Sequence, residues 1–292
     1  MARTPTTATQ TAALGIVVNL VLAAVKIATG LAGNSYALIG DGIESTTDVI
    51  TSLIVWGGLR ISASPPDENH PFGHGKAESL AAVIAAFGLL AAAAVIAVQS
   101  IHEILEPHKT PAWFTLPVLL GVILTKELLS RYALRVSDEL GSTSLQVDAW
   151  HHRSDALTSA AVVIGITVAL IGGPGYEAAD DWAALLACGV IAFNGIFLLR
   201  TALREVMDAA VAAELLDRIR EVAMQVPGVG AIEKCRVRKS GLGFLMDIHV
   251  QVDGNLTVTA GHEIGHRVKD RLLAANLKIQ DVVVHIEPLP AA

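Results

Sequence analysis

The sequence predicts an α-helical membrane protein with six transmembrane helices, followed by a small α+β domain outside the membrane. Of the 292 residues, 52% are hydrophobic and only 17% are charged. The mean hydropathy is +0.53, which is typical of membrane proteins. Six apolar windows are near or above the roughly 20 residues that a helix needs to cross a bilayer. After about residue 208, charged and apolar residues alternate and no such window occurs.

The apolar windows divide the chain into three parts. They fall at about 11–31, 36–60, 78–101, 113–135, 149–171 and 182–203. We therefore expect an N-terminal tail over 1–10, a transmembrane domain over 11–207 and a C-terminal domain over 208–292. The Thr-rich N-terminus has no small-residue cleavage site after a short apolar core, so the sequence predicts no cleavable signal peptide.

Basic residues gather on one side of the predicted helices. Those near the helix ends on the N-terminal side are Arg3, Arg60, Lys76, Arg131, Arg135, Arg200 and Arg204. The opposite loops hold one basic residue, Lys109, among several acidic ones. The positive-inside rule then places both termini and the C-terminal domain in the cytoplasm. The net charge of −7 and the lack of a basic run give no reason to expect nucleic acid as a partner.

The second and fifth windows carry matched rows of polar side chains. Both rows have the spacing i, i+3, i+7: Asp41, Glu44 and Asp48, and then Asp148, His151 and Asp155. This spacing places each row on one face of a helix. Because carboxylates and imidazoles are costly in a lipid-spanning segment, we interpret the rows as two halves of one ion site. The four predicted ligands are Glu44, Asp48, His151 and Asp155.

Three carboxylates and one imidazole form a tetrahedral ligand set that suits zinc and tolerates other divalent first-row metals. Asp41 and Asp148 extend the two rows, although Asp41 follows Gly40 and a helix cap is an equally good interpretation for it. A four-ligand site at membrane depth, with no enclosing soluble domain, indicates transport. His151 can bind a metal ion only as a neutral imidazole.

The loop after the second window contains a further group of metal-ligand side chains. Asp67, His70 and His74 are spaced three and four residues apart, and Pro and Gly residues constrain the path of the loop. These side chains can converge on one metal ion. The alternative is a solvated loop at the membrane interface whose histidines have no function.

The C-terminal domain shows the order helix, strand, strand, helix, strand. The expected elements span about 211–226, 231–239, 243–252, 258–275 and 280–287. Val226–Gly230 ends the first helix, and Ser240–Gly243 forms the turn between the first two strands. This αββαβ order predicts a ferredoxin-like, metallochaperone-like domain.

A second class of function arises from His262-Glu-Ile-Gly-His266, which matches the H-E-x-x-H pattern of zinc hydrolases. Taken alone, the motif predicts a membrane metalloprotease with Glu263 as general base. The context argues against this, since the domain is too small for a protease cleft and the motif lies outside the predicted spans. A metal sensor that transports nothing is a third class, but it would not need the matched rows in the membrane.

The loop Pro-Pro-Asp-Glu-Asn-His-Pro-Phe-Gly-His-Gly-Lys-Ala-Glu-Ser, residues 65–79, resembles the signature of the cation diffusion facilitators. These are six-span exporters of divalent metals, and the resemblance covers almost the whole chain. The four predicted ligands fall where the family has its transport site. The resemblance implies that each protomer of a homodimer exchanges an outbound metal ion for inbound protons. His151 is then the best candidate for the exchanged proton, because metal binding requires a neutral imidazole. It also implies an integral protein of the bacterial inner membrane.

The resemblance implies two further groups of residues. By position, Lys76 and Asp208 match the charge interlock of the family at the dimer interface. The family's cytoplasmic metal ligands correspond to His249, His262, His285 and Glu287, with Glu233 as a weaker match. The resemblance further implies that the C-terminal domain dimerises and senses metal.

The resemblance also shows one departure, which concerns the metal. The first transport ligand, often Asp, His or Asn in the family, is here Glu44. Zinc is the first expectation from the imidazole and carboxylate set. Iron(II) and manganese(II) are alternatives, because three oxygen ligands make a harder site.

Overall fold

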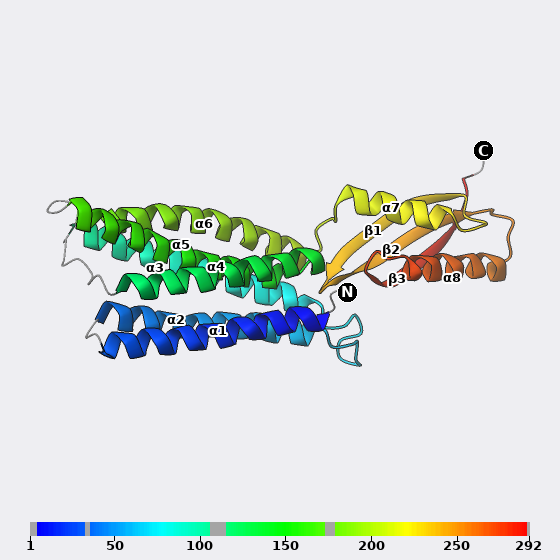
Figure 1. Cartoon of the computed structure of the whole chain (residues 1–292). Coiled ribbons are helices and arrows are strands. Elements are labelled where there is room, and N and C mark those ends of the chain that lie inside the picture. The colour runs from blue at the N-terminus through cyan, green and yellow to red at the C-terminus, as the bar shows by residue number, and fades with distance from the viewer. Residues whose placement is uncertain (1–4, 33–35, 106–114, 173–178, 291–292) are drawn as a thin grey trace. The chain divides into compact units, whose positions relative to one another are not determined.

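The computed structural model describes residues 5–32, 36–105, 115–172 and 179–290, and it divides into two compact units, Met1–Leu203 and Arg204–Ala292. The first unit consists of long helices, shown in Figure 1. They are α1 (Pro5–Ala32), α2 (Tyr36–Ser62), α3 (Lys76–Leu105), α4 (Thr115–Leu140), α5 (Thr143–Gly172) and α6 (Ala179–Val206), the last of which ends in the second unit.

Each of these helices is long enough to cross a bilayer. The shortest, α4, has 26 residues, which corresponds to ~39 Å against a hydrocarbon core of about 30 Å. By length and composition, three segments within the described residues are also apolar enough to span: Thr6–Thr29, Lys76–His102 and Leu185–Val206. Helices α2, α4 and α5 carry charged side chains such as Asp48, Lys126 and Asp155. The prediction of an α-helical membrane domain is confirmed.

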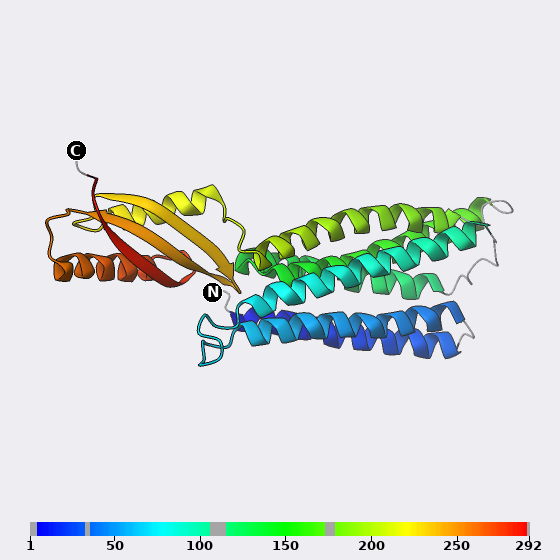
Figure 2. The ribbon, with the colours of Figure 1, turned by 180° about the vertical axis from the view of Figure 1, so that it is seen from behind.

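Small residues let the helices approach one another. Helix α1 packs mainly on α2, and α4 mainly on α5, while α3 contacts both α2 and α5. Figures 1 and 2 show α1 and α2 side by side, next to the other four helices. Ala82 and Ala86 of α3 are fully buried, whereas large apolar side chains such as Leu186 and Phe193 of α6 are exposed. An apolar exterior of this kind fits contact with lipid.

The second unit is a two-layer α+β domain. Its elements are α7 (Ala213–Met224), β1 (Ala231–Ser240), β2 (Gly243–Val252), α8 (Val258–Ala274) and β3 (Ile279–Pro288). The sheet has the order β1-β2-β3, with β1 antiparallel and β3 parallel to β2. The predicted αββαβ order is confirmed, with element bounds that differ by at most two residues.

One hydrophobic core holds this domain together. Ile219 of α7, Val268 and Leu272 of α8, and Ile248 and Val250 of β2 are fully buried in a single cluster. Both helices therefore cover the same face of the sheet. The alternate residues of the strands point to the opposite face, because side chains on a strand alternate.

Candidate metal sites

Two helices bring three of the predicted transport ligands together. His151 Nε2 of α5 lies 2.9 Å from Asp48 Oδ1 of α2. Asp155 lies four residues beyond His151 on α5, and one ligand atom from each of the three residues lies within 4.8 Å of the others. Asp48 and His151 are buried and Asp155 is half-buried. The geometry therefore offers two carboxylates and one imidazole to a single ion.

The remaining residues of the two rows have different surroundings. The side chains of Asp41 and Glu44 lie outside the described residues, although both positions belong to α2. Asp148 is buried, and its Oδ1 accepts a hydrogen bond of 2.7 Å from Ser52 Oγ. Its Oδ2 lies 3.6 Å from His152 Nε2. Asp148 thus has buried polar partners and lies outside the group of three ligands.

Lys126 of α4 also belongs to this site, although it is not part of either row of spaced polar residues. Its side chain is fully buried, and its Nζ lies 2.6 Å from Asp155 Oδ2 and 3.2 Å from Asp48 Oδ2. The same ammonium donates a hydrogen bond of 2.7 Å to Asn19 Oδ1 of α1. Four helices therefore contribute to the site. The sequence signal that could have identified Lys126 is a charged residue inside an apolar window.

The loop between α2 and α3 brings Asp67, His70 and His74 together. Asp67 Oδ1 lies 3.1 Å from His70 Nδ1, and Asp67 Oδ2 lies 3.4 Å from His74 Nε2. The backbone N–H of His70 donates to the Asp67 carboxylate at 2.6 Å, and this bond lowers the pKa of Asp67. Gly73, with a φ of 78°, allows the turn before His74. One ion can contact all three side chains.

The exposed face of the C-terminal sheet carries the third group. His249 Nδ1 of β2 lies 2.7 Å from Glu287 Oε1 of β3, and His285 Nε2 lies 3.4 Å from the same oxygen. Glu233 Oε2 of β1 lies 3.3 Å from His249 Nδ1. Three neighbouring strands thus supply these four residues. The hydrogen bond from His249 is the main cause of a lowered pKa of Glu287.

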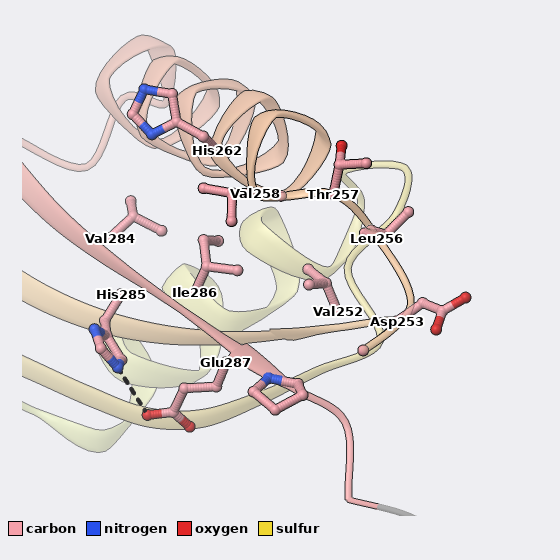
Figure 3. Close-up of a pocket in the computed structure, with 13 residues that line it drawn as sticks. Val252, Asp253, Leu256, Thr257, Val258, His262, Val284, His285, Ile286 and Glu287 are labelled. Carbon is pink, nitrogen blue, oxygen red and sulfur yellow. Dashed lines mark ion pairs between the residues drawn. The ribbon is translucent and has the colours of Figure 1, made fainter.

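His262 lies apart from that group. A pocket of about 460 Å³ at the edge of the domain is lined by His262 together with His285 and Glu287. Figure 3 shows His262 on α8, across the pocket from the His285–Glu287 pair on β3. Val284 and Ile286 pack against the core under α8, so the alternate residues His285 and Glu287 face away from α8.

The H-E-x-x-H motif lies on the exposed side of α8. His262 and His266 are both exposed, with Nε2 atoms 3.0 Å apart, and Glu263 is also exposed. This places two imidazoles next to each other on a solvated helix face.

Lys76 and Asp208, the residues that are expected to form the charge interlock, belong to different compact units. Lys76 is the first residue of α3. Asp208 follows α6 with a φ of 54°, and its Oδ2 lies 3.4 Å from Arg238 Nη1 of β1.

Comparison with known proteins gives two matching families. Residues 12–207 match the cation efflux transmembrane domain, and residues 211–289 match the cytoplasmic domain of cation efflux proteins. The chain is 30% identical over 281 residues to the manganese efflux system protein MneP of Bacillus subtilis, and the match covers 95% of each chain. It is 31% identical to the magnetosome protein MamB of Paramagnetospirillum magneticum, covering 90% of this chain and 88% of MamB. A solved MamM CTD is 30% identical, covers 26% of this chain and 95% of its own, and has a TM-score of 0.26.

Proposed function

The chain belongs to the cation efflux family, and on this premise we propose that it exports a divalent metal ion from the cytoplasm in exchange for protons. Members of this family are transporters of metal cations, so the metalloprotease alternative is set aside. The observation that carries the proposal is the group of buried Asp48, buried His151 and half-buried Asp155, which joins α2 and α5 within the membrane domain. Glu44 is proposed as the fourth ligand.

Zinc is the proposed substrate, because an imidazole with carboxylates is a common zinc ligand set. Manganese(II) is the second candidate, supported by the similarity to a manganese efflux protein and by the oxygen-rich ligand set. Iron(II) is a third candidate, since the ligand set is equally compatible with it.

The proposed mechanism is competition between a metal ion and protons for the same side chains. With the site open to the cytoplasm, deprotonated carboxylates and neutral His151 bind the ion. With the site open to the outside, protons replace the ion, and His151 is the proposed carrier of one of them. Proton entry down a membrane potential of 100 mV supplies about 2.3 kcal/mol per charge.

The proposal includes a homodimer with both termini in the cytoplasm. The match to the cytoplasmic domain of cation efflux proteins supports dimerisation through residues 208–292. We propose that residues 11–207 form the transport domain. We further propose that the loop group and the sheet group bind metal as regulatory or structural sites.

Metal flux into proteoliposomes with a pH gradient tests the proposal. Zinc, manganese(II), iron(II) and cadmium are compared for the wild type, for Asp155→Ala and for Glu263→Gln. We expect gradient-dependent flux of at least one metal in the wild type, its loss in Asp155→Ala because a carboxylate ligand is removed, and its retention in Glu263→Gln. Absence of flux in a wild type that binds metal would contradict export and favour a sensor.

A further inference from the structure

The Lys126 ammonium occupies the position between the two carboxylates of the proposed transport site. Its Nζ is 2.6 Å from Asp155 and 3.2 Å from Asp48, and the side chain is fully buried. The contact with Asp155 has the length of a strong charge-assisted hydrogen bond. In this arrangement, the buried carboxylate of Asp48 and the half-buried carboxylate of Asp155 are already neutralised in part by a cation that belongs to the protein.

A divalent metal ion and this ammonium would use the same oxygen atoms. Metal–ligand distances to carboxylate oxygen and imidazole nitrogen are about 2.0–2.2 Å, so a bound ion must sit within the group of Asp48, His151 and Asp155. An ammonium hydrogen-bonded to the same carboxylates would then be only a few ångströms from a doubly charged ion. Like charges at such a distance repel strongly away from water. Joint occupancy is therefore unfavourable.

We propose that Lys126 is a tethered cation that fills the transport site when no metal is bound and is displaced when the metal binds. This inference rests on the proposed function and deepens it. Lys126 thereby acts as a competitor of the substrate, within the same polypeptide. It lowers the affinity for the metal and keeps the empty site charge-paired, which matters because unpaired buried charges are costly.

The structure provides a partner for the displaced ammonium. Asn19 Oδ1 of α1 already accepts a hydrogen bond of 2.7 Å from Lys126 Nζ. The Asn19 amide lies 3.5 Å from Ser52 Oγ, which in turn donates to the buried carboxylate of Asp148. A lysine has a flexible four-carbon stem, so its ammonium can turn from the carboxylates toward Asn19 without leaving the helix interface.

Binding and transport by the purified full-length protein test the inference. Equilibrium binding of Zn²⁺ and Mn²⁺ is measured for the wild type, Lys126→Met and Lys126→Arg. Methionine keeps the length of the stem and removes the charge, so we expect it to bind the metal at least about tenfold more tightly. Release should slow, and maximal transport should fall. Arginine keeps the charge and pairs more firmly with carboxylates, so we expect weaker metal binding than in the wild type.

Lys26→Met is the matched control. Lys26 is a second buried lysine of the membrane domain, and its Nζ donates to Ser45 Oγ at 2.9 Å. Its replacement should leave metal affinity within about twofold of the wild type. Equal or weaker metal binding by a folded Lys126→Met protein would overturn the inference. If that variant does not fold, equal or tighter binding by Lys126→Arg overturns it. If the wild-type protein transports no metal, the proposed function itself is refuted.

Discussion

At the scale of single residues, Glu287 shows how one neighbour changes the chemistry of a side chain. The Nδ1–H of His249 donates to its carboxylate at 2.7 Å, and this bond holds the pKa of Glu287 below its ordinary value of 4.5. A lowered carboxyl pKa adds stability that is present above about pH 4.5 and is lost as the pH falls through the lowered pKa. Glu287 therefore stays ionised at neutral pH.

We predict that His249→Leu raises the pKa of Glu287 toward its ordinary value, because the variant removes the main hydrogen bond to the ionised form. The measurement is a titration of ¹³C-labelled carboxyl groups by NMR. Asp281 on the same strand is the control: its pKa is lowered by a hydrogen bond of 2.7 Å from Lys269 and should not change. An unchanged Glu287 titration in the variant would show that His249 does not stabilise the carboxylate.

Residues related by helix periodicity were the part of the site that the sequence could predict. Asp48, His151 and Asp155 belong to two rows with equal spacing, and such rows stand out in apolar windows. Lys126 and Asn19 are single polar residues on their own helices, so no repeat marks them. Their role depends on which helices are neighbours, and that information exists only in the folded structure.

At the scale of elements, the contact between α2 and α3 depends on one glycine. A Cβ placed on Gly58 would lie 2.3 Å from Ala81 Cβ and 3.1 Å from the backbone oxygen of Ala77. The preceding Gly57 differs, since no described atom outside its local helix lies within 4 Å of a Cβ placed there. Substitution of each of these two adjacent glycines therefore distinguishes the effect of packing on stability from the effect of helix propensity.

We predict that Gly58→Ala destabilises the membrane domain and Gly57→Ala does not. Alanine gains about 1 kcal/mol of helix propensity at either position. At Gly58, the contact of 2.3 Å with Ala81 Cβ places the cost of overpacking toward the upper end of the typical range of about 1–3 kcal/mol, which outweighs that gain. Transport should also fall in Gly58→Ala, because α2 carries Asp48. Thermal unfolding in detergent measures the difference, and equal melting temperatures for the two variants would contradict close packing at Gly58.

Strand patterns predicted the elements of the C-terminal domain, but they could not predict where a residue of α8 lies relative to the sheet. The ranges expected from the sequence, 231–239, 243–252 and 280–287, match the three strands of the C-terminal domain to within one residue at each end. His249, His285 and Glu287 share the exposed sheet face, whereas His262 lies on α8 over the core face. The expectation that His262 is a metal ligand together with these residues came from a resemblance. Whether a residue of α8 lies near them depends on how α8 packs on the sheet.

At the scale of the whole molecule, the proposed homodimer allows charges of one chain to act on its partner. We propose that Lys76 and Asp208, which belong to different compact units, form a charge pair at the dimer interface. A single chain contains no information about a partner copy, so apolar windows and helix periodicity could not predict this pair. Charge reversal is the appropriate test, because a true pair tolerates exchange of its two signs.

We predict that Lys76→Asp and Asp208→Lys each weaken the dimer and that the double variant recovers part of the loss. Like charges in the single variants repel, and a surface pair of this kind contributes up to about 1 kcal/mol, or roughly fivefold in dimer affinity. Native mass spectrometry across protein concentrations measures the dimer fraction, with metal flux as a second readout. Asp208 also contacts Arg238 at 3.4 Å, so Arg238→Gln controls for the loss of that contact within the chain. Purely additive losses in the double variant would mean that Lys76 and Asp208 act independently, and the dimer would then need another charged contact.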